Sequence, residues 1–421
     1  MKNSITKHYF RILVFLLLIP FGCPAVYAEK PMAEIAGYVK NSRNKKVISN
    51  VSITIPGTNI STVTNEDGYF LLKIPSSNLK NGIKAEQIGF QSKFLPLNDS
   101  TKEEMTILLE PTGKVLKEIL VLGGDPREIV EEALRKIPAN YADNDNLFQG
   151  FYRETIQKGN RFINISEALV NVLKKPYNYR SVNGEKVSIH RGRKIISPKT
   201  SDTLAVKLMG GPHMPIMLDA VKNGDHLFNL EEIDNFEFKM EPGTMIDDRP
   251  HYAISFKPRV AFSYPLNLGK FYIDGEDLTI SRVEFELDMS DKDKVARSIL
   301  QKKPSGLRFK PLEVSGVVTY KNSDGKAYIN YISSKMRFKC DWKKRLFSST
   351  YTSFAEMVMV NRDDSVDKSK KLTDTFGSRK VFSDYVDNYW DEDFWKDYNI
   401  IEPTESLEKA VEKLKKDSSK R

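Results

Sequence analysis

The sequence predicts a mainly β protein with an N-terminal β-sandwich, a linker helix, a large antiparallel domain and a C-terminal helix. Short segments that alternate apolar and polar residues recur from 33 to 109, with turn residues between them, which is typical of a sandwich. Longer alternating segments follow from 143 onward and predict an open, strongly curved sheet or partial barrel. With 421 residues the chain is too long for one ordinary core, so two or three domains are expected.

Residues 1–28 have the features of a signal peptide. Three basic residues precede the apolar run 12–21, which is too short to span a bilayer as a helix. Val26-Tyr27-Ala28 fits a small-residue cleavage site, so the mature chain is expected to begin at Glu29. These features predict an exported protein that is periplasmic or associated with the outer membrane.

The alternative to cleavage after Ala28 is a lipoprotein anchored through Cys23, although residues 20–22 fit a lipobox poorly. No transmembrane helix is predicted in the mature chain, because no later stretch is long and apolar enough. If the signal peptide is removed, Cys340 remains alone and no intramolecular disulfide can form.

The net charge does not indicate a nucleic-acid-binding protein. The chain has 65 Lys and Arg against 56 Asp and Glu, a formal net charge of +9, and the basic residues are dispersed. Nucleic-acid-binding domains usually gather such residues on one face. A solvated surface is therefore expected, and nucleic acid is not among the expected partners.

The segment "STVTNEDGYFLLKIP", residues 61–75, contains the clearest turn of the predicted sandwich, 29–112. Residues 65–68 combine side chains that bond their own backbone with a glycine that tolerates positive φ. Val63 before the turn, and Phe70, Leu72 and Ile74 after it, alternate with polar residues. The pattern predicts a β-hairpin in a half-buried sheet.

The stretch "IAGYVKNSRNKKVISNVSITIPGTNISTVTNEDGYFLLKIP", followed by "IGF", resembles the carboxypeptidase regulatory-like domain. That family has an immunoglobulin/transthyretin-like sandwich and is common in exported cell-envelope proteins of Bacteroidetes. The family often has a proline and an alanine before the second strand, where this chain has residues 48–50, Ile-Ser-Asn. The resemblance implies a module without catalytic residues of its own, so carboxypeptidase activity is not expected.

A linker and amphipathic helix are predicted over 113–142. Asp125-Pro126 is a typical helix start, apolar residues recur at helical spacing from Ile129, and Pro138 is expected to end the helix. The apolar stripe predicts packing on the next domain.

The large β domain is predicted over 143–402, and 403–421 reads as a capped helix that continues into a basic tail. Asp324-Gly325 predicts a hairpin turn within the large β domain. The segments "GFYRET", "EALVNV", "GKFYID" and "DEDFWKDYNIIEP" resemble the C-terminal part of Bacteroidetes proteins that begin with the same regulatory-like domain. That resemblance implies no particular activity.

No catalytic residue, metal ligand or cofactor is predicted. H-E-x-x-H, G-x-S-x-G and G-x-x-x-x-G-K are absent, and no histidine begins the H-x-x-E pattern of a zinc carboxypeptidase. S-x-x-K matches such as those at 77–80 and 365–368 lack the other elements of a penicillin-binding site.

Two groups of residues are candidates for ligand binding. Arg191 and Arg193 precede a Gly-rich loop that contains His213, and together they could receive an anion. The alternative is an ion pair on a strand and an ordinary tight turn. Trp390 and Trp395 lie among acidic residues and could bind a glycan or partner, or could instead close one end of the sheet.

The sequence thus predicts a non-catalytic exported cell-envelope protein, a binding or structural module that pairs a regulatory-like sandwich with a large β domain. Its partner, an envelope protein, a glycan or a small ligand, is not specified. The alternatives are a ligand or lipid carrier with an apolar cavity in the curved sheet, and an enzyme with its site in the large domain.

Overall fold

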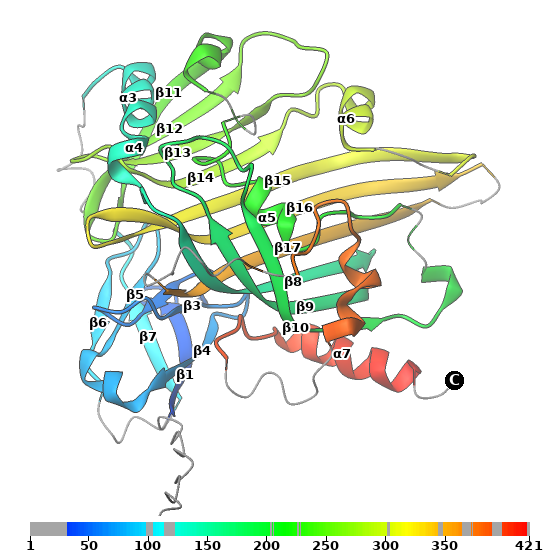
Figure 1. Ribbon diagram of the computed structural model, residues 1–421, viewed down its shortest axis with the longest axis horizontal. Coiled ribbons are helices and arrows are strands. Elements are labelled where there is room, and N and C mark those ends of the chain that lie inside the picture. The colour runs from blue at the N-terminus through cyan, green and yellow to red at the C-terminus, as the bar shows by residue number, and fades with distance from the viewer. Residues whose placement is uncertain are drawn as a thin grey trace, which may run out of the picture. The chain divides into compact units, whose positions relative to one another are not determined.

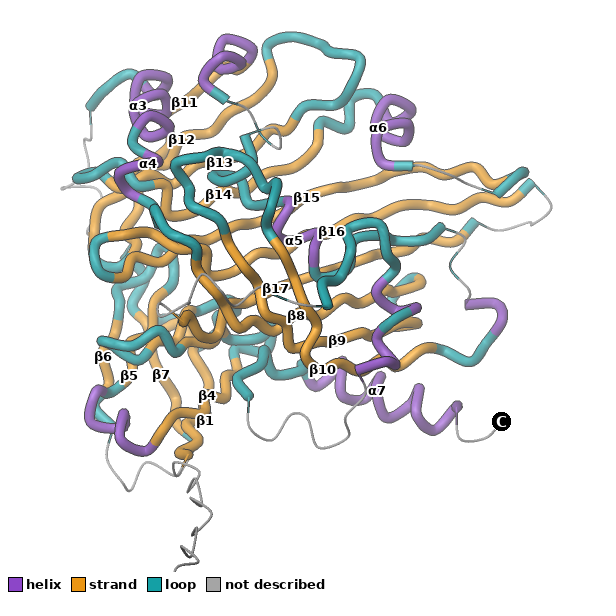
Figure 2. The backbone as a smooth tube through the Cα atoms, viewed as in Figure 1, coloured by secondary structure: helices purple, strands orange, loops and turns teal. Residues whose placement is uncertain are grey.

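A computed structural model shows the fold of the protein (Figure 1). It describes residues 32–97, 104–112, 123–202, 204, 206–224, 227, 229–300, 304–343, 348–363, 372, 374–389 and 398–418. The predicted signal peptide and Trp390 and Trp395 lie outside the described residues, so those predictions stay predictions. Figure 2 shows that strands dominate this part of the chain, with helices at the periphery of the sheets.

Seven strands form the N-terminal sandwich, as the alternating pattern predicts. They are β1 (Met32–Asn41), β2 (Ser52–Thr54), β3 (Ser61–Val63), β4 (Tyr69–Pro75), β5 (Ile83–Glu86), β6 (Lys93–Leu95) and β7 (Met105–Leu109). One sheet has the order β4-β1-β7 and the other the order β3-β2-β5-β6. Alternate side chains from both sheets, among them Val39, Ile53 and Phe70, form a fully buried core.

The turn at 65–68 does not make the predicted hairpin. β3 and β4 belong to different sheets, so the turn is a corner between the two layers. The Asn65 side-chain oxygen accepts hydrogen bonds from the backbone N–H groups of Asp67 and Tyr69, both at 3.0 Å. Gly68 has a φ of 73°, and its carbonyl accepts a bond from the Val39 N–H. The turn chemistry is as predicted, but β4 pairs with β1 instead of β3.

Two short helices connect the sandwich to the large sheet. α3 (Pro126–Arg135) is capped by Asp125, whose side chain accepts hydrogen bonds from two backbone N–H groups of the first turn. α4 (Ile137–Asn140) follows at once, so Pro138 sits in the first turn of a second helix, where proline is tolerated, instead of ending the first. Val130, Ala133 and Leu134 bury the apolar stripe of α3, which confirms that it packs on the next domain.

A ten-stranded antiparallel sheet forms the rest of the fold. Its strands are β8 (Asn146–Lys158), β9 (Arg161–Lys174), β10 (Lys186–Ile196), β11 (Phe236–Ile246), β12 (Arg249–Pro258), β13 (Asn267–Asp274), β14 (Ile280–Leu287), β15 (Leu307–Ser323), β16 (Lys326–Trp342) and β17 (Ser349–Asp363). Their order is β10-β9-β8-β17-β16-β15-β14-β13-β12-β11, so β10 and β11 are edges and the sheet stays open. The predicted Asp324-Gly325 turn joins β15 to β16.

One face of this sheet, here called the helix face, carries the main core. α3, α4 and α5 (His213–Met217) pack on it, together with side chains such as Ile254, Phe271 and Met357. α6 (Lys292–Ile299) lies against β15. The carrier alternative, which needs an apolar cavity in the curved sheet, stays a prediction.

The opposite face, here called the sandwich face, is covered by the N-terminal sandwich and by the C-terminal segment. Val63 of β3 packs with Phe151, Val358 and Ile400. α7 (Glu405–Ser418) lies against β9 and β10, as Figure 1 shows at the bottom of the view. No helix in the described part of the chain is long and apolar enough to cross a membrane.

Backbone carbonyls of the large sheet and the C-terminal segment accept hydrogen bonds from the sandwich. Ser61 donates to the Met359 carbonyl and Thr62 to the Ile400 carbonyl, each at 3.1 Å. Asp67 accepts a 2.8 Å hydrogen bond from the Glu405 N–H and so caps α7. The domain boundaries drawn from the sequence stay predictions.

Candidate functional site

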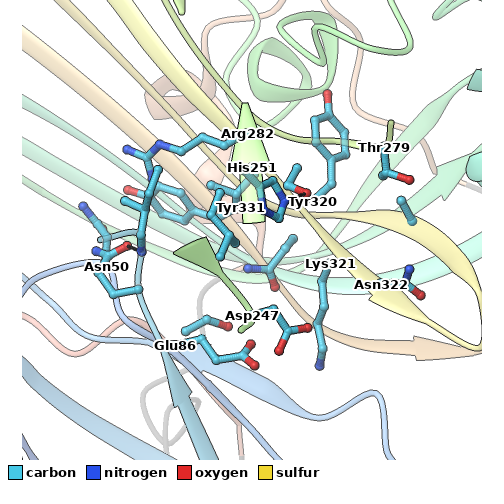
Figure 3. A pocket seen from close by; sticks show the side chains of 18 of the residues that line it. Asn50, Glu86, Asp247, His251, Thr279, Arg282, Tyr320, Lys321, Asn322 and Tyr331 are labelled. Atoms are coloured by element: carbon cyan, nitrogen blue, oxygen red, sulfur yellow. Dashed lines mark hydrogen bonds between the residues drawn. The ribbon is translucent and has the colours of Figure 1, made fainter. Parts of the chain in front are cut away.

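A cavity of about 140 Å³ lies between the sandwich and the sandwich face of the large sheet (Figure 3). A single water needs only ~10–15 Å³ measured in this way, so the cavity has room for a small organic molecule. Polar groups from β2, β5, the strands β12 to β16 and the adjoining turns line part of it, and apolar atoms line the rest. Among the polar residues are Asn50, Glu86, Asp247, Ser281, Lys321 and Asn330.

Two carboxyl groups and a lysine meet at one end of the cavity. Asp247 and Asp248 form the two-residue turn between β11 and β12, and both have positive φ, as a type I′ turn requires. Lys84 on β5 forms an ion pair with Asp247, and its ammonium lies 2.5 Å from a carboxyl oxygen of Glu86. Burial, and then the hydrogen bond with Asp247 and its charge, raise the pKa of Glu86 to about 8. At neutral pH Glu86 is therefore mostly protonated.

Lys321 on β15 contributes a second lysine to this end of the cavity. Its side chain points toward Glu86 and Asp247 in Figure 3. Within the described part of the chain, no group accepts a hydrogen bond from its ammonium or forms an ion pair with it. Burial lowers the pKa of Lys321, while the charges of Glu86 and Asp247 oppose that shift. The ammonium itself is not fully buried, so it is open to water and to a ligand in the cavity.

His251 and Ser281 also face the cavity, and their arrangement is not a catalytic triad. His251 Nε2 lies 2.8 Å from the Ser281 hydroxyl, and its Nδ1 lies 2.9 Å from the Arg249 carbonyl. The carboxylate of Asp274 is 3.8 Å from the same Nε2, so it does not orient the opposite nitrogen as a triad aspartate does. Burial lowers the pKa of His251, which fits a neutral ring held between two hydrogen bonds.

Arg191 and Arg193 lie on β10, on the sandwich face. Arg193 pairs with Glu167 at 2.5 Å, and the same carboxylate pairs with the buried Arg153 at 2.7 Å. Glu356 joins Arg153 from β17 at 3.3 Å. The charges of the two arginines hold the pKa of Glu167 below its usual range, against the effect of burial. Arg193 is thus part of an ion-pair network on the strands.

His213 lies at the start of α5, on the helix face. Its Nδ1 is buried without a hydrogen-bond partner in the described residues, and burial lowers its pKa. The large sheet therefore separates His213 from Arg191 and Arg193, and the three do not form one pocket. Among the described residues, no group of His, Cys, Asp or Glu side chains could hold a metal ion.

The cavity residues were not among the sequence-derived candidates. The one local signal was "IDDRP", 246–250, where two aspartates between alternating segments indicate a tight hairpin turn. Nothing in the sequence places that turn beside Glu86, because the two are far apart in the chain and meet only through domain packing.

The comparisons with known proteins identify the N-terminal domain. Residues 35–121 match the model of the CarboxypepD_reg-like domain, which confirms that part of the family resemblance. No curated protein matches the sequence.

Three solved structures are similar to 58% of this chain at low identity. A DUF1329 family protein from Desulfovibrio piger is 11% identical, with 97% of its chain covered and a TM-score of 0.24. A candidate outer membrane lipoprotein-sorting protein domain from Vibrio parahaemolyticus is 11% identical, with 94% covered and a TM-score of 0.25. A LolA superfamily protein from Nitrosomonas europaea is 13% identical, with 97% covered and a TM-score of 0.22. None of them bears on the function of this chain.

Proposed function

We propose that the protein is an exported, non-catalytic binding protein of the cell envelope and that its cavity holds a small anionic ligand. The observation that carries the ligand class is the ammonium of Lys321 at the cavity wall, which has no hydrogen-bond acceptor or ion pair among the described residues. A carboxylate or phosphate group of a ligand supplies both the opposite charge and the missing hydrogen-bond acceptors.

The charges around Lys321 support an anion. Near pH 7 Glu86 is mostly neutral, and the charge of Asp247 is balanced by Lys84. The positive charge of Lys321 is then left over. Asn50, Asn330 and hydroxyl groups on the neighbouring strands can bond further polar groups of the ligand, so a hydroxylated or amide-containing acid fits best.

The predicted signal peptide and the match to the regulatory-like domain support a location in the cell envelope. We place the protein among exported proteins of the Bacteroidetes type, either periplasmic or associated with the outer membrane. The large sheet and the sandwich then form one binding unit, since the cavity takes its walls from both.

Thermal denaturation with a panel of small anions tests the proposal. Glucuronate, glucose 6-phosphate and glutamate are the probes, and neutral glucose is the control. At one hundred times its dissociation constant, a ligand stabilises the folded state by about 2.7 kcal/mol, which raises the melting temperature by several degrees.

The matched variants are Lys321→Met, which keeps the length of the side chain, and Lys257→Met on the exposed end of β12. Lys321→Met should abolish the ligand-induced shift, and Lys257→Met should keep it. If none of the three anions raises the melting temperature, or if Lys321→Met responds as the wild type does, the assignment of the cavity is wrong.

A further inference from the structure

Beyond the cavity along β15 and β16, the sandwich face of the large sheet is positively charged. At this end of the two strands, side chains alternate between the two faces. Leu307, Phe309, Phe338 and Cys340 are buried on the helix face. The residues between them are exposed on the other face: Arg308, Lys310, Arg337 and Lys339, here called the cationic stripe. In Figure 1 these strand ends project away from the sandwich.

The strand register brings like charges together within the stripe. Lys310 lies directly opposite Lys339 in the antiparallel pair of β15 and β16. Like charges at opposed positions destabilise a sheet, so this pair is unfavourable for the isolated protein. In the described part of the chain, neither lysine has an ion-pair partner, and Arg308 has none either. Arg337 lies 3.6 Å from the carboxylate of Glu313, and Asp341 is the register partner of Arg308 at the end of the stripe.

We propose that the cationic stripe docks the protein on an anionic membrane surface. An occupant with negative charge removes the repulsion between Lys310 and Lys339. The neighbouring positions on β17 are Thr350 and Thr352, with Phe354 further along, so the surface is mainly polar. The centre of a protein interface is usually depleted in charged residues and rich in apolar ones. Lipid headgroups, which rearrange laterally, suit a flat row of cations better.

Vesicle cosedimentation with the full chain tests the proposal. One set of vesicles contains 30% phosphatidylglycerol in phosphatidylcholine, and the other contains phosphatidylcholine alone. The basic residues before the apolar segment 12–21 also favour anionic lipid, so the substitution described next, which keeps residues 1–28, isolates the contribution of the stripe. The wild type should partition more strongly into the anionic vesicles, and salt should weaken that preference.

The test variant is the double substitution Lys310→Gln and Lys339→Gln. At ~1 kcal/mol for each cation near an anionic membrane, it should reduce partitioning roughly 30-fold. Lys45→Gln with Lys46→Gln removes two exposed charges from a sandwich loop and should leave partitioning unchanged. The stripe variant should also melt no lower than the wild type, because a like-charge pair is lost.

Equal partitioning of the wild type into both kinds of vesicle overturns the proposal. So does a stripe variant that still binds the anionic vesicles. Capture on an acidic polysaccharide such as alginate, without preference for anionic vesicles, also overturns it and indicates a polymer as the occupant.

Discussion

At the scale of single residues, Glu86 links the stability of the molecule to pH. Its folded-state pKa is about 8, against 4.5 for an ordinary glutamate. Between these values the folded state keeps a proton that the unfolded state has lost, so stability falls as pH rises through this window.

Glu86→Gln keeps the shape of the protonated side chain and cannot ionise. We expect the variant to melt like the wild type near pH 4.5 and at least about 2 °C higher at pH 9. Melting curves across this pH range measure the difference, with the exposed Glu110→Gln as the control. A wild-type advantage at pH 9 would contradict the raised pKa.

A comparison of Gly68 with Gly57 separates backbone strain at positive φ from steric overlap with neighbouring residues. Both have a φ of 73°, but a Cβ at Gly68 would lie 2.9 Å from the Val39 carbonyl oxygen and from Val47, whereas Gly57 faces open space. Gly57→Val should lower the free energy of unfolding by about 1–2 kcal/mol, because valine is strained at positive φ. Gly68→Val should lower the free energy of unfolding by a further ~1–3 kcal/mol, because its side chain also collides with Val39 and Val47. Chemical denaturation gives both values, and equal losses would show that the corner turn has room to move.

Residue-level patterns predicted local chemistry better than pairing. The capping role of Asp125 and the turn-forming residues 65–68 follow from the sequence, because these hydrogen bonds join neighbours. The pairing partner of β4 does not follow from the sequence, because the alternation of a strand is the same whichever strand it pairs with.

At the scale of elements, the corner turn and α7 depend on each other. Asp67 caps the helix through the Glu405 N–H, and Asn65 donates to the carbonyls of Glu402 and Pro403. The turn of the sandwich is thus also the docking site of the C-terminal segment.

Asp67→Ala should loosen the first turn of α7. Loss of an N-cap costs about 1 kcal/mol, so amide hydrogen exchange at residues 405–407 should become up to about five times faster. Glu66→Ala, beside it and exposed, is the control. Unchanged exchange at these amides would mean that Thr404 caps the helix unaided; its hydroxyl lies 3.2 Å from the Leu407 N–H.

At the scale of the whole molecule, the alternation of apolar residues predicted two β layers and an open sheet. It could not predict the cavity, whose walls come from residues between 50 and 333. Several contacts between domains are made here by hydroxyl and amide side chains that bond backbone carbonyls, and such groups occur on most surfaces. No periodicity marks them.

The sandwich should fold without the large sheet. Its core of Val39, Ile53, Phe70 and other apolar side chains is complete within residues 35–109. A fragment of residues 29–112 should therefore give a cooperative melt in circular dichroism without added metal, at a lower temperature than the full chain, because Val63 loses its partners. Phe70→Ser in the fragment is the unfolded control. A wild-type fragment that matches this control would show that the sandwich depends on the rest of the chain.

The bond between Asn65 and Pro403 joins residues 338 positions apart. Ribosomes add roughly 5–20 residues per second, so this distance corresponds to about 20–70 seconds of synthesis. During that interval the sandwich has its own core but lacks the segment that seals it to the sheet. A stop codon just before residue 398 would remove the carbonyl acceptors of Asn65 and Arg153 and the N–H group that bonds Asp67. Docking of the C-terminal segment can therefore occur only at the end of synthesis, and nascent chains tethered to the ribosome should still be open to proteases where that segment docks.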